Sequence, residues 1–145
     1  MRNILLTILL VPCFAFGQKE ELTMAAILSD AGTLAKKIEM ELGQEIVRME
    51  FDIVQTSKST FRTLTADFEY GILAFGDFRI KDIDIKVYKW VNNQWSLVEK
   101  DEEVKPNAIV TFKPPFTAEY RIDIIAATFE EGHDVGHYGL IVFHD

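Results

Sequence analysis

Two different hydrophobic periods divide the chain after its first 17 residues. Between Lys19 and Leu42 the apolar residues recur every three or four positions, which predicts one amphipathic helix. Gly43 follows as a residue suited to end a helix, and Gly32 is a weak point at which this one is expected to bend or split. The apolar stripe needs a partner. The sheet that follows is the expected partner, and docking of the helix on another protein is the alternative.

From Val47 onward the hydrophobic period is two. Alternating apolar and polar residues predict about eight short strands with no helices between them, at residues 47–53, 61–68, 70–75, 80–90, 95–99, 108–112, 120–128 and 138–143. Ser57–Ser59 is a predicted turn, and Asn92-Asn93 is a predicted hairpin tip because asparagine tolerates positive φ. We therefore expect a mainly β fold, an antiparallel β-sandwich or jelly roll, whose alternate side chains fill the space between two sheets.

The first 17 residues have the layout of a cleavable secretory signal. Arg2 supplies a positive charge, residues 4–11 are apolar apart from Thr7, and Ala15 and Gly17 are small residues at the expected cleavage site. The apolar run is too short to span a bilayer, which needs about 20 residues. This predicts a signal peptide at 1–17, a helical segment at 18–43 and a sandwich domain at 44–145, in a secreted or periplasmic protein.

Cys13 is the single cysteine of the chain and lies inside the predicted signal. A lipoprotein would be modified at this residue, but Pro12 directly before it fits that motif poorly. Cleavage after Gly17 would leave a chain with no cysteine and no disulfide, so an ordinary hydrophobic core must stabilise it.

The charge of the chain excludes two classes of partner. The formal net charge is −8, and loss of Arg2 with the signal makes the remainder one unit more negative. Nucleic acids and anionic membrane surfaces both require a basic face, so neither is an expected partner. Surplus carboxylates permit cation binding, and they also keep an exported protein soluble.

Three aspartates are candidate calcium ligands. Asp82 and Asp84 lie two apart in a predicted strand, so their side chains share one face, and Asp101 begins an acidic loop. Calcium takes six to eight oxygen ligands of this kind, so it is the candidate ion for these residues. The sequence does not otherwise lead us to expect a cofactor. The alternative is that Asp82 and Asp84 form the polar outer face of an amphipathic strand.

The residues His133, Asp134 and His137 form the densest cluster of ligand-type side chains. Two histidines four apart share one face of a helix, as many zinc sites require. Gly132 and Gly136 make a helix here unfavourable, so the spacing alone does not bring the histidines together. A polar loop between two strands is the alternative, and a small metal-binding protein or metal-dependent hydrolase is the second hypothesis for function.

Aromatic residues near the predicted hairpin are the candidates for ligand binding. Trp90 and Trp95 flank its tip, and Tyr88 and Phe116 are further candidates. Exposed aromatic side chains on a sandwich bind sugars and protein partners. The alternative is that the two tryptophans pair across the hairpin and pack into the core.

The sequence contains no recognisable catalytic motif. The predicted mature chain lacks cysteine, and no serine lies in a G-x-S-x-G elbow or in a motif with histidine. Glycine-rich phosphate loops are absent as well. The first hypothesis is therefore an exported, non-catalytic binding or structural module, whose partner is an extracellular protein or a polysaccharide.

Roughly residues 60–143 resemble the bacterial pre-peptidase C-terminal domains. The segments that carry the resemblance occur in the family's order: Tyr70-Gly71-Ile72, Asp82-Ile83-Asp84-Ile85-Lys86-Val87-Tyr88, residues 112–122 and His137-Tyr138-Gly139-Leu140-Ile141-Val142. The family's glycine before the tyrosine strand is replaced by Ala118-Glu119. The resemblance implies a small jelly-roll accessory domain of a secreted bacterial protein, here without the peptidase that normally precedes it.

Overall fold

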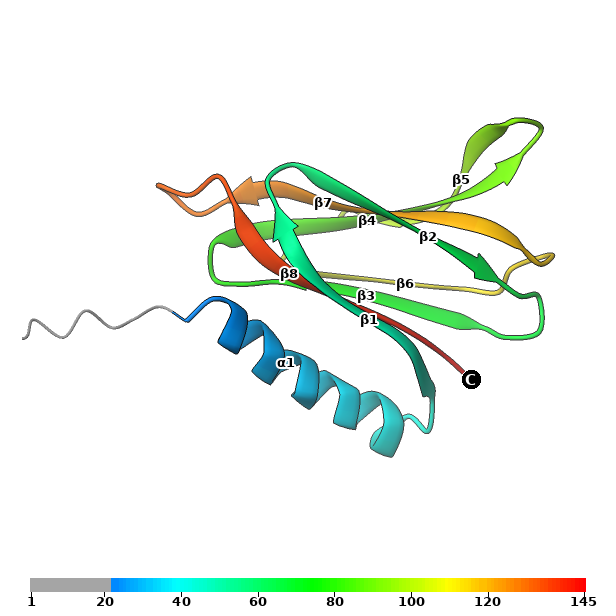
Figure 1. The fold of residues 1–145 in the computed structure, drawn as a ribbon, viewed down its shortest axis with the longest axis horizontal. Helices are drawn as coiled ribbons and strands as arrows, with labels where there is room; N and C mark the ends of the chain where they lie inside the picture. Colours follow the sequence, from blue (N-terminus) through cyan, green and yellow to red (C-terminus); the bar gives the residue numbers. More distant parts are fainter. Residues whose placement is uncertain (1–21) are drawn as a thin grey trace, which may run out of the picture.

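The computed structural model describes residues 22–145, which form a β-sandwich with one helix on its outer surface (Figure 1). The strands are β1 (Glu45–Val54), β2 (Ser57–Leu64), β3 (Tyr70–Gly76), β4 (Ile80–Val91), β5 (Gln94–Asp101), β6 (Asn107–Phe112), β7 (Ala118–Phe129) and β8 (Gly136–His144). They form two four-stranded antiparallel sheets, sheet A with the order β1-β8-β3-β6 and sheet B with the order β2-β7-β4-β5. This is the strand order of a jelly roll, so the predicted mainly β fold is confirmed. The predicted signal peptide and Cys13 lie outside the described residues.

The main core fills the space between the two sheets. On β4, Ile83, Ile85 and Val87 are fully buried, as their alternation predicts. They lie beside Ile122 and Ile124 of β7, which are also fully buried. Burial of side chains of this size contributes about 1.5–3 kcal/mol each, so the alternation fixes which face of each strand points inward.

The alternation at residues 47–53 predicts that Phe51 points between the two sheets with Val47, and this prediction is wrong for Phe51. The pairing of β1 with β8 shifts register between Ile46 and Arg48, and this irregularity changes which side chains point inward. Phe51 packs beneath the helix instead of between the sheets. On the inner face, Arg48 forms an ion pair with Glu50 and donates a hydrogen bond to the carbonyl of Phe61 at 3.2 Å.

The boundaries of β2 also differ from the prediction. Ser57–Ser59, a predicted turn, pairs with β7 as the first part of β2. The strand ends at Leu64, four residues before the predicted end. Leu64 is fully buried, and Thr65 donates its backbone N–H to the hydroxyl of Tyr70 at 3.2 Å. Here tertiary pairing outweighs the local preference of serine for turns.

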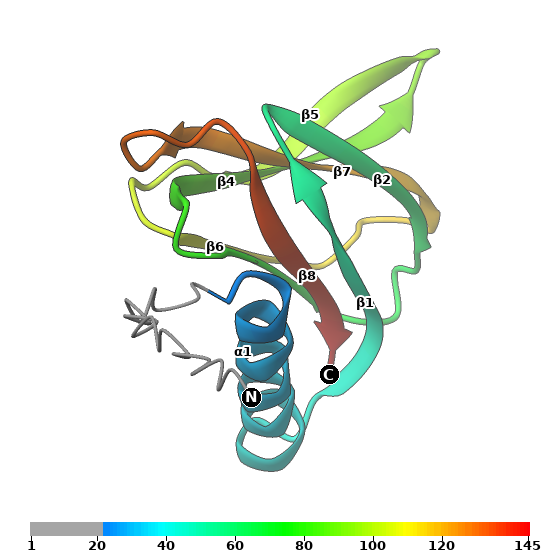
Figure 2. The ribbon, with the colours of Figure 1, turned by 60° about the vertical axis from the view of Figure 1, so that its left-hand side comes forward.

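The N-terminal helix packs on the outer face of sheet A, beside β8 and β1 (Figure 2). It consists of α1 (Met24–Lys36) and a terminal π-helical turn, η1 (Lys37–Glu41). Gly32 neither bends nor splits it, and Gly43 follows it with φ +65°, the conformation expected of a helix-ending glycine. No helix among residues 22–145 is long and apolar enough to cross a bilayer.

A second, smaller core joins the helix to sheet A. Ile27, Ala31 and Ile38 are buried against Phe75 of β3 and Phe143 of β8. The sheet is therefore the partner of the apolar stripe, as the sequence predicted.

A buried ion pair closes one end of the sandwich. The side chain of Asp77 is fully buried and accepts hydrogen bonds from Arg79 Nε at 3.1 Å and from the backbone N–H of His137 at 2.9 Å. An Nη atom of Arg79 also lies 2.9 Å from His137 Nδ1. Burial acts to raise the pKa of Asp77, but the hydrogen bonds from Arg79 and His137 outweigh it and hold this pKa below its ordinary value.

Replacement of Ile27 by alanine should destabilise the protein by about 2–5 kcal/mol, because it leaves a cavity in the smaller core. Leu28 is the matched control. It follows Ile27 directly and is 52% exposed, so Leu28→Ala should cost well under about 1 kcal/mol. Urea denaturation followed by circular dichroism measures both variants. Equal effects would show that the helix does not rest on sheet A through Ile27.

The variant Arg79→Ala should cost about 3–5 kcal/mol at pH 7, because it leaves a buried carboxylate without its cation. Since the folded-state pKa of Asp77 is lowered, its contribution is complete above the unfolded pKa and is lost as the pH falls through the folded value, below about 4. In the variant the burial of Asp77 is no longer opposed by Arg79, so the pKa of Asp77 rises and this acid-dependent loss of stability should shrink or reverse. Lys81→Ala, at an exposed position at the start of the following strand β4, is the control for urea denaturation across pH 3–7.

Candidate functional site

One row of side chains crosses the outer face of sheet B from edge to edge. Phe61 of β2 lies opposite Arg121 of β7, Arg121 lies opposite Tyr88 of β4, and Tyr88 lies opposite Leu97 of β5. Directly opposite residues in an antiparallel sheet place their side chains on the same face, close enough to interact. The register therefore puts a cation at the centre of a row of apolar and aromatic side chains.

Two tryptophans extend this row along the β4–β5 hairpin, which projects beyond the rest of the sandwich (Figures 1 and 2). Trp90 and Trp95 are directly opposite each other, with ring centroids 5.1 Å apart and an angle of 63° between the ring planes. Asn92 and Asn93 close the hairpin with φ values of 51° and 59°, as predicted for the tip. The tryptophans thus pair across the hairpin, but on the outer face of sheet B.

Arg121 is held in place from two sides. Its guanidinium carbon lies 4.3 Å from the ring centroid of Tyr88 and 5.3 Å from that of Trp95. Its Nε lies 3.0 Å from a carboxylate oxygen of Asp123, which also accepts a hydrogen bond from the Ser59 hydroxyl at 2.7 Å. Among residues 22–145, the terminal Nη atoms of Arg121 donate no hydrogen bond to the protein, and the side chain is 24% exposed.

We call this surface the aromatic face; its members are Phe61, Tyr88, Trp90, Trp95, Leu97 and Arg121. Trp90, Leu97 and Phe61 are 46%, 48% and 49% exposed, although they are large apolar side chains on regular strands. Contiguous exposed apolar surface of this kind is typical of interaction sites. Sequence patterns did not identify Phe61, Leu97 and Arg121 as site residues, because only the pairing register of the strands brings them beside the tryptophans.

Phe116 does not belong to the aromatic face. It lies in the loop before β7, and the ammonium group of Lys89 lies 5.1 Å from its ring centroid. Lys89 points to the side of β4 opposite Tyr88 and Trp90, because it lies between them in the strand. Of the four aromatic candidates from the sequence, the structure therefore gathers Tyr88, Trp90 and Trp95 and separates Phe116.

Asp82 and Asp84 do not form the shared outer face that their spacing predicts. The pairing of β4 with β7 is irregular on both sides of Asp82, and this residue is buried, with its carboxylate accepting a hydrogen bond from the backbone N–H of Lys105 at 3.1 Å. Asp84 remains on the outer face, half-buried. Burial, followed by the negative charges of Asp82 and Glu102, raises the pKa of Asp84.

Asp101 is engaged in structural hydrogen bonds. Its carboxylate accepts the backbone N–H of Ile109 at 2.9 Å and that of Glu103 at 3.1 Å, and it lies 3.1 Å from the ammonium group of Lys105. Burial acts to raise the pKa of Asp101, but these hydrogen bonds hold it below its ordinary value. The aspartate thus links the end of β5 to β6.

The histidine cluster is divided between a loop and a strand. His133 and Asp134 are exposed in the loop before β8, where the ring of His133 packs edge-on against Phe78. His137 lies inside β8 and interacts with Arg79. Within residues 22–145, no group of three or more histidine, cysteine, aspartate or glutamate side chains is placed to hold a metal ion. A metal site at His133, Asp134 and His137 stays a prediction, and the positions of these three residues do not support it.

Comparisons with known proteins do not assign the chain to a family. No family model matches it, and no curated protein sequence matches it. Among solved structures, the mitogen of Yersinia pseudotuberculosis is similar at a TM-score of 0.47 and 11% identity, over 68% of this chain and 85% of the mitogen. A periplasmic inhibitor of g-type lysozyme from Aeromonas hydrophila is similar at a TM-score of 0.45 and 12% identity, over 72% of this chain and 90% of the inhibitor. None of this tests the resemblance to pre-peptidase C-terminal domains, which stays a prediction.

Proposed function

We propose that this protein is an exported, non-catalytic binding protein that recognises a protein partner through the aromatic face. The observation that carries the proposal is the composition of that face, which places tryptophan, tyrosine and arginine side chains in one exposed cluster. These three residue types are the most enriched among the side chains that dominate protein–protein binding energy. Export is supported by the pattern of residues 1–17.

Arg121 gives the face its specificity. Its guanidinium is fixed against Tyr88 and Asp123 and keeps terminal N–H groups free, so a carboxylate or main-chain carbonyl of the partner can accept from it. The surrounding apolar side chains exclude water on binding, and a charge-assisted hydrogen bond is strengthened when it is desolvated.

A protein fits this surface better than a polysaccharide. Successive sugar rings stack on aromatic rings whose free faces are parallel, but Trp90 and Trp95 are inclined at 63°. Phe61 and Trp95 are inclined at 50°, and Arg121 covers the ring of Tyr88. An irregular apolar surface around one fixed cation suits the side chains of a folded partner.

The experiment is capture of partners from a cell-envelope protein extract of the source organism by the immobilised protein. We expect a protein that is retained by the wild type and lost with Trp90→Ala and with Arg121→Ala, each by at least about tenfold in affinity, as for truncation of a central interface residue. Met40→Ala is the control, because Met40 is 79% exposed on the helix, away from sheet B. Circular dichroism establishes that all four proteins are folded.

Two further measurements distinguish the kind of ligand. Protease treatment of the extract should abolish capture. The chain has two tryptophans, and both belong to the aromatic face, so intrinsic fluorescence reports on this surface alone. Binding of the captured protein should change this fluorescence, and soluble polysaccharides should leave it unchanged. Retention that survives protease, or that is equal for all variants, would contradict a protein partner at this face.

A further inference from the structure

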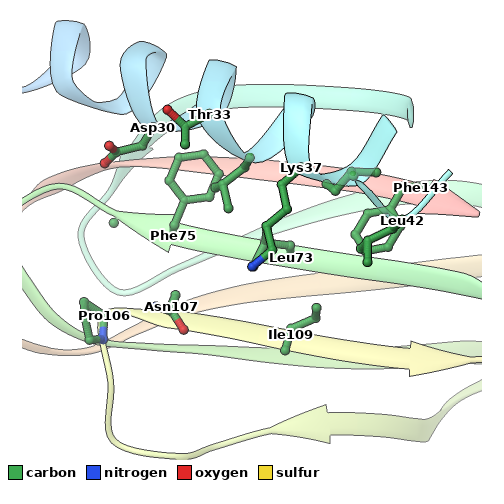
Figure 3. A pocket seen from close by; sticks show the side chains of 13 residues that line it. Asp30, Thr33, Lys37, Leu42, Leu73, Phe75, Pro106, Asn107, Ile109 and Phe143 are labelled. Atoms are coloured by element: carbon green, nitrogen blue, oxygen red, sulfur yellow. The ribbon is translucent and has the colours of Figure 1, made fainter. Parts of the chain in front are cut away.

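A groove lies on the other side of the molecule, between the helix and sheet A (Figure 3). Its volume is about 700 Å³. We call it the helix–sheet groove; its apolar lining comes mainly from Leu34, Ile38, Leu42, Leu73, Phe75 and Phe143. Sites for small ligands are typically concave, mostly apolar and about 300–1,000 Å³ in volume.

The groove exists because the helix covers only part of sheet A. The helix packs on β8 and β1 and, within residues 22–145, does not extend over β6 at the far edge of the sheet. Ile109 of β6 forms the wall opposite the helix and is 46% exposed (Figure 3). The floor between the two walls is formed by β3.

Two glycines allow the aromatic rings of the floor to lie directly on the backbone of the sheet. Gly71 lies opposite Phe143 and Gly139 lies opposite Phe75, on neighbouring strands. A Cβ atom added at Gly71 would lie 2.2 Å from the ring of Phe143, and one added at Gly139 would lie 2.3 Å from the ring of Phe75. Both rings therefore lie over glycine backbone, which leaves space above them beneath the helix.

The π-helical turn brings a cation to the groove. Lys37 and Leu42 are five residues apart, which would place them about 140° apart around a regular α-helix. In η1 the N–H of Leu42 donates to the carbonyl of Lys37 at 3.1 Å, an i to i+5 hydrogen bond that brings the two residues to one side. Both side chains line the groove, and Lys37 extends across it towards Leu73 (Figure 3).

Lys37 is the single cationic side chain among the residues that line the groove, and the ion pairs among residues 22–145 do not include it. Asp30 lies at the other end, seven residues earlier on the helix, or about 10 Å along its axis. An anionic group is therefore attracted to the position of Lys37 and repelled from that of Asp30. The chain as a whole is strongly acidic, so a site for an anion depends on this local cation.

From this arrangement we infer that the helix–sheet groove binds a single-chain amphiphile with an anionic head, of the class of long-chain fatty acids. The alkyl chain lies on the apolar floor between the helix and Ile109. The carboxylate pairs with Lys37. This inference is independent of the aromatic face, which lies on the other sheet.

The test is calorimetric titration of the protein with three probes that share a twelve-carbon chain: laurate, dodecanol and dodecyltrimethylammonium, each below its aggregation limit. We expect one laurate per protein and at least about tenfold weaker binding of the cationic probe, since only an anionic head is attracted to Lys37. Lys37→Glu should weaken laurate binding by at least about tenfold. Lys36→Glu is the matched control, because Lys36 is the adjacent lysine and does not line the groove, and it should bind as the wild type does.

Ile109→Glu tests the apolar wall and should also abolish laurate binding, whereas Val104→Glu, at a 79% exposed position outside the groove, should not. Tryptophan fluorescence should stay constant during the titration, because both tryptophans lie on sheet B. Absence of laurate binding, equal affinity for the three heads, or equal effects of Lys36→Glu and Lys37→Glu would overturn the inference. A dimer seen by sedimentation and dissolved by Ile109→Glu would overturn it too, and would make a second copy the occupant.

Discussion

The structure depends on one hydrophobic core between two four-stranded sheets, which is filled by the side chains on the inner face of the strands. Ile85 of β4, Ile124 of β7 and Leu140 of β8 are all fully buried there, and their neighbours in sequence necessarily point the other way. The inner faces are thus committed to stability, which leaves the two outer faces free to differ. Sheet A carries apolar residues outward and is partly covered by the helix, whereas sheet B carries a polar face interrupted by aromatic residues.

The sequence predicted well those elements whose signal is local. The helix, the alternation of Ile83, Ile85 and Val87, and the hairpin tip at Asn92-Asn93 each follow from the period or the turn preference of a short segment, and each is confirmed. Of the candidate site, Tyr88, Trp90 and Trp95 were identified because they are large aromatic residues around a recognisable turn. Their identification as ligand-binding residues stays a prediction.

What the sequence did not predict depends on how strands pair. The register shift in β1 moves Phe51 from the core to the helix side, and irregular pairing around Asp82 buries a residue that the alternation placed outside. Neither irregularity has a local sequence signal. Arg121 reaches the tryptophans through the register of β7 against β4, and Lys37 is brought beside Leu42 by a π-helical turn that the helical period does not predict. Both outer surfaces therefore depend on tertiary structure.

The β4–β5 hairpin presents the two tryptophans as a preformed pair. Both of its tip residues have left-handed backbone conformations, its strands are paired up to the tip, and the two tryptophan rings contact each other across it. The contact between the two rings restricts their rotamers before any partner arrives. Covering them would then cost little conformational entropy, so more of the contact energy remains to slow dissociation of a complex.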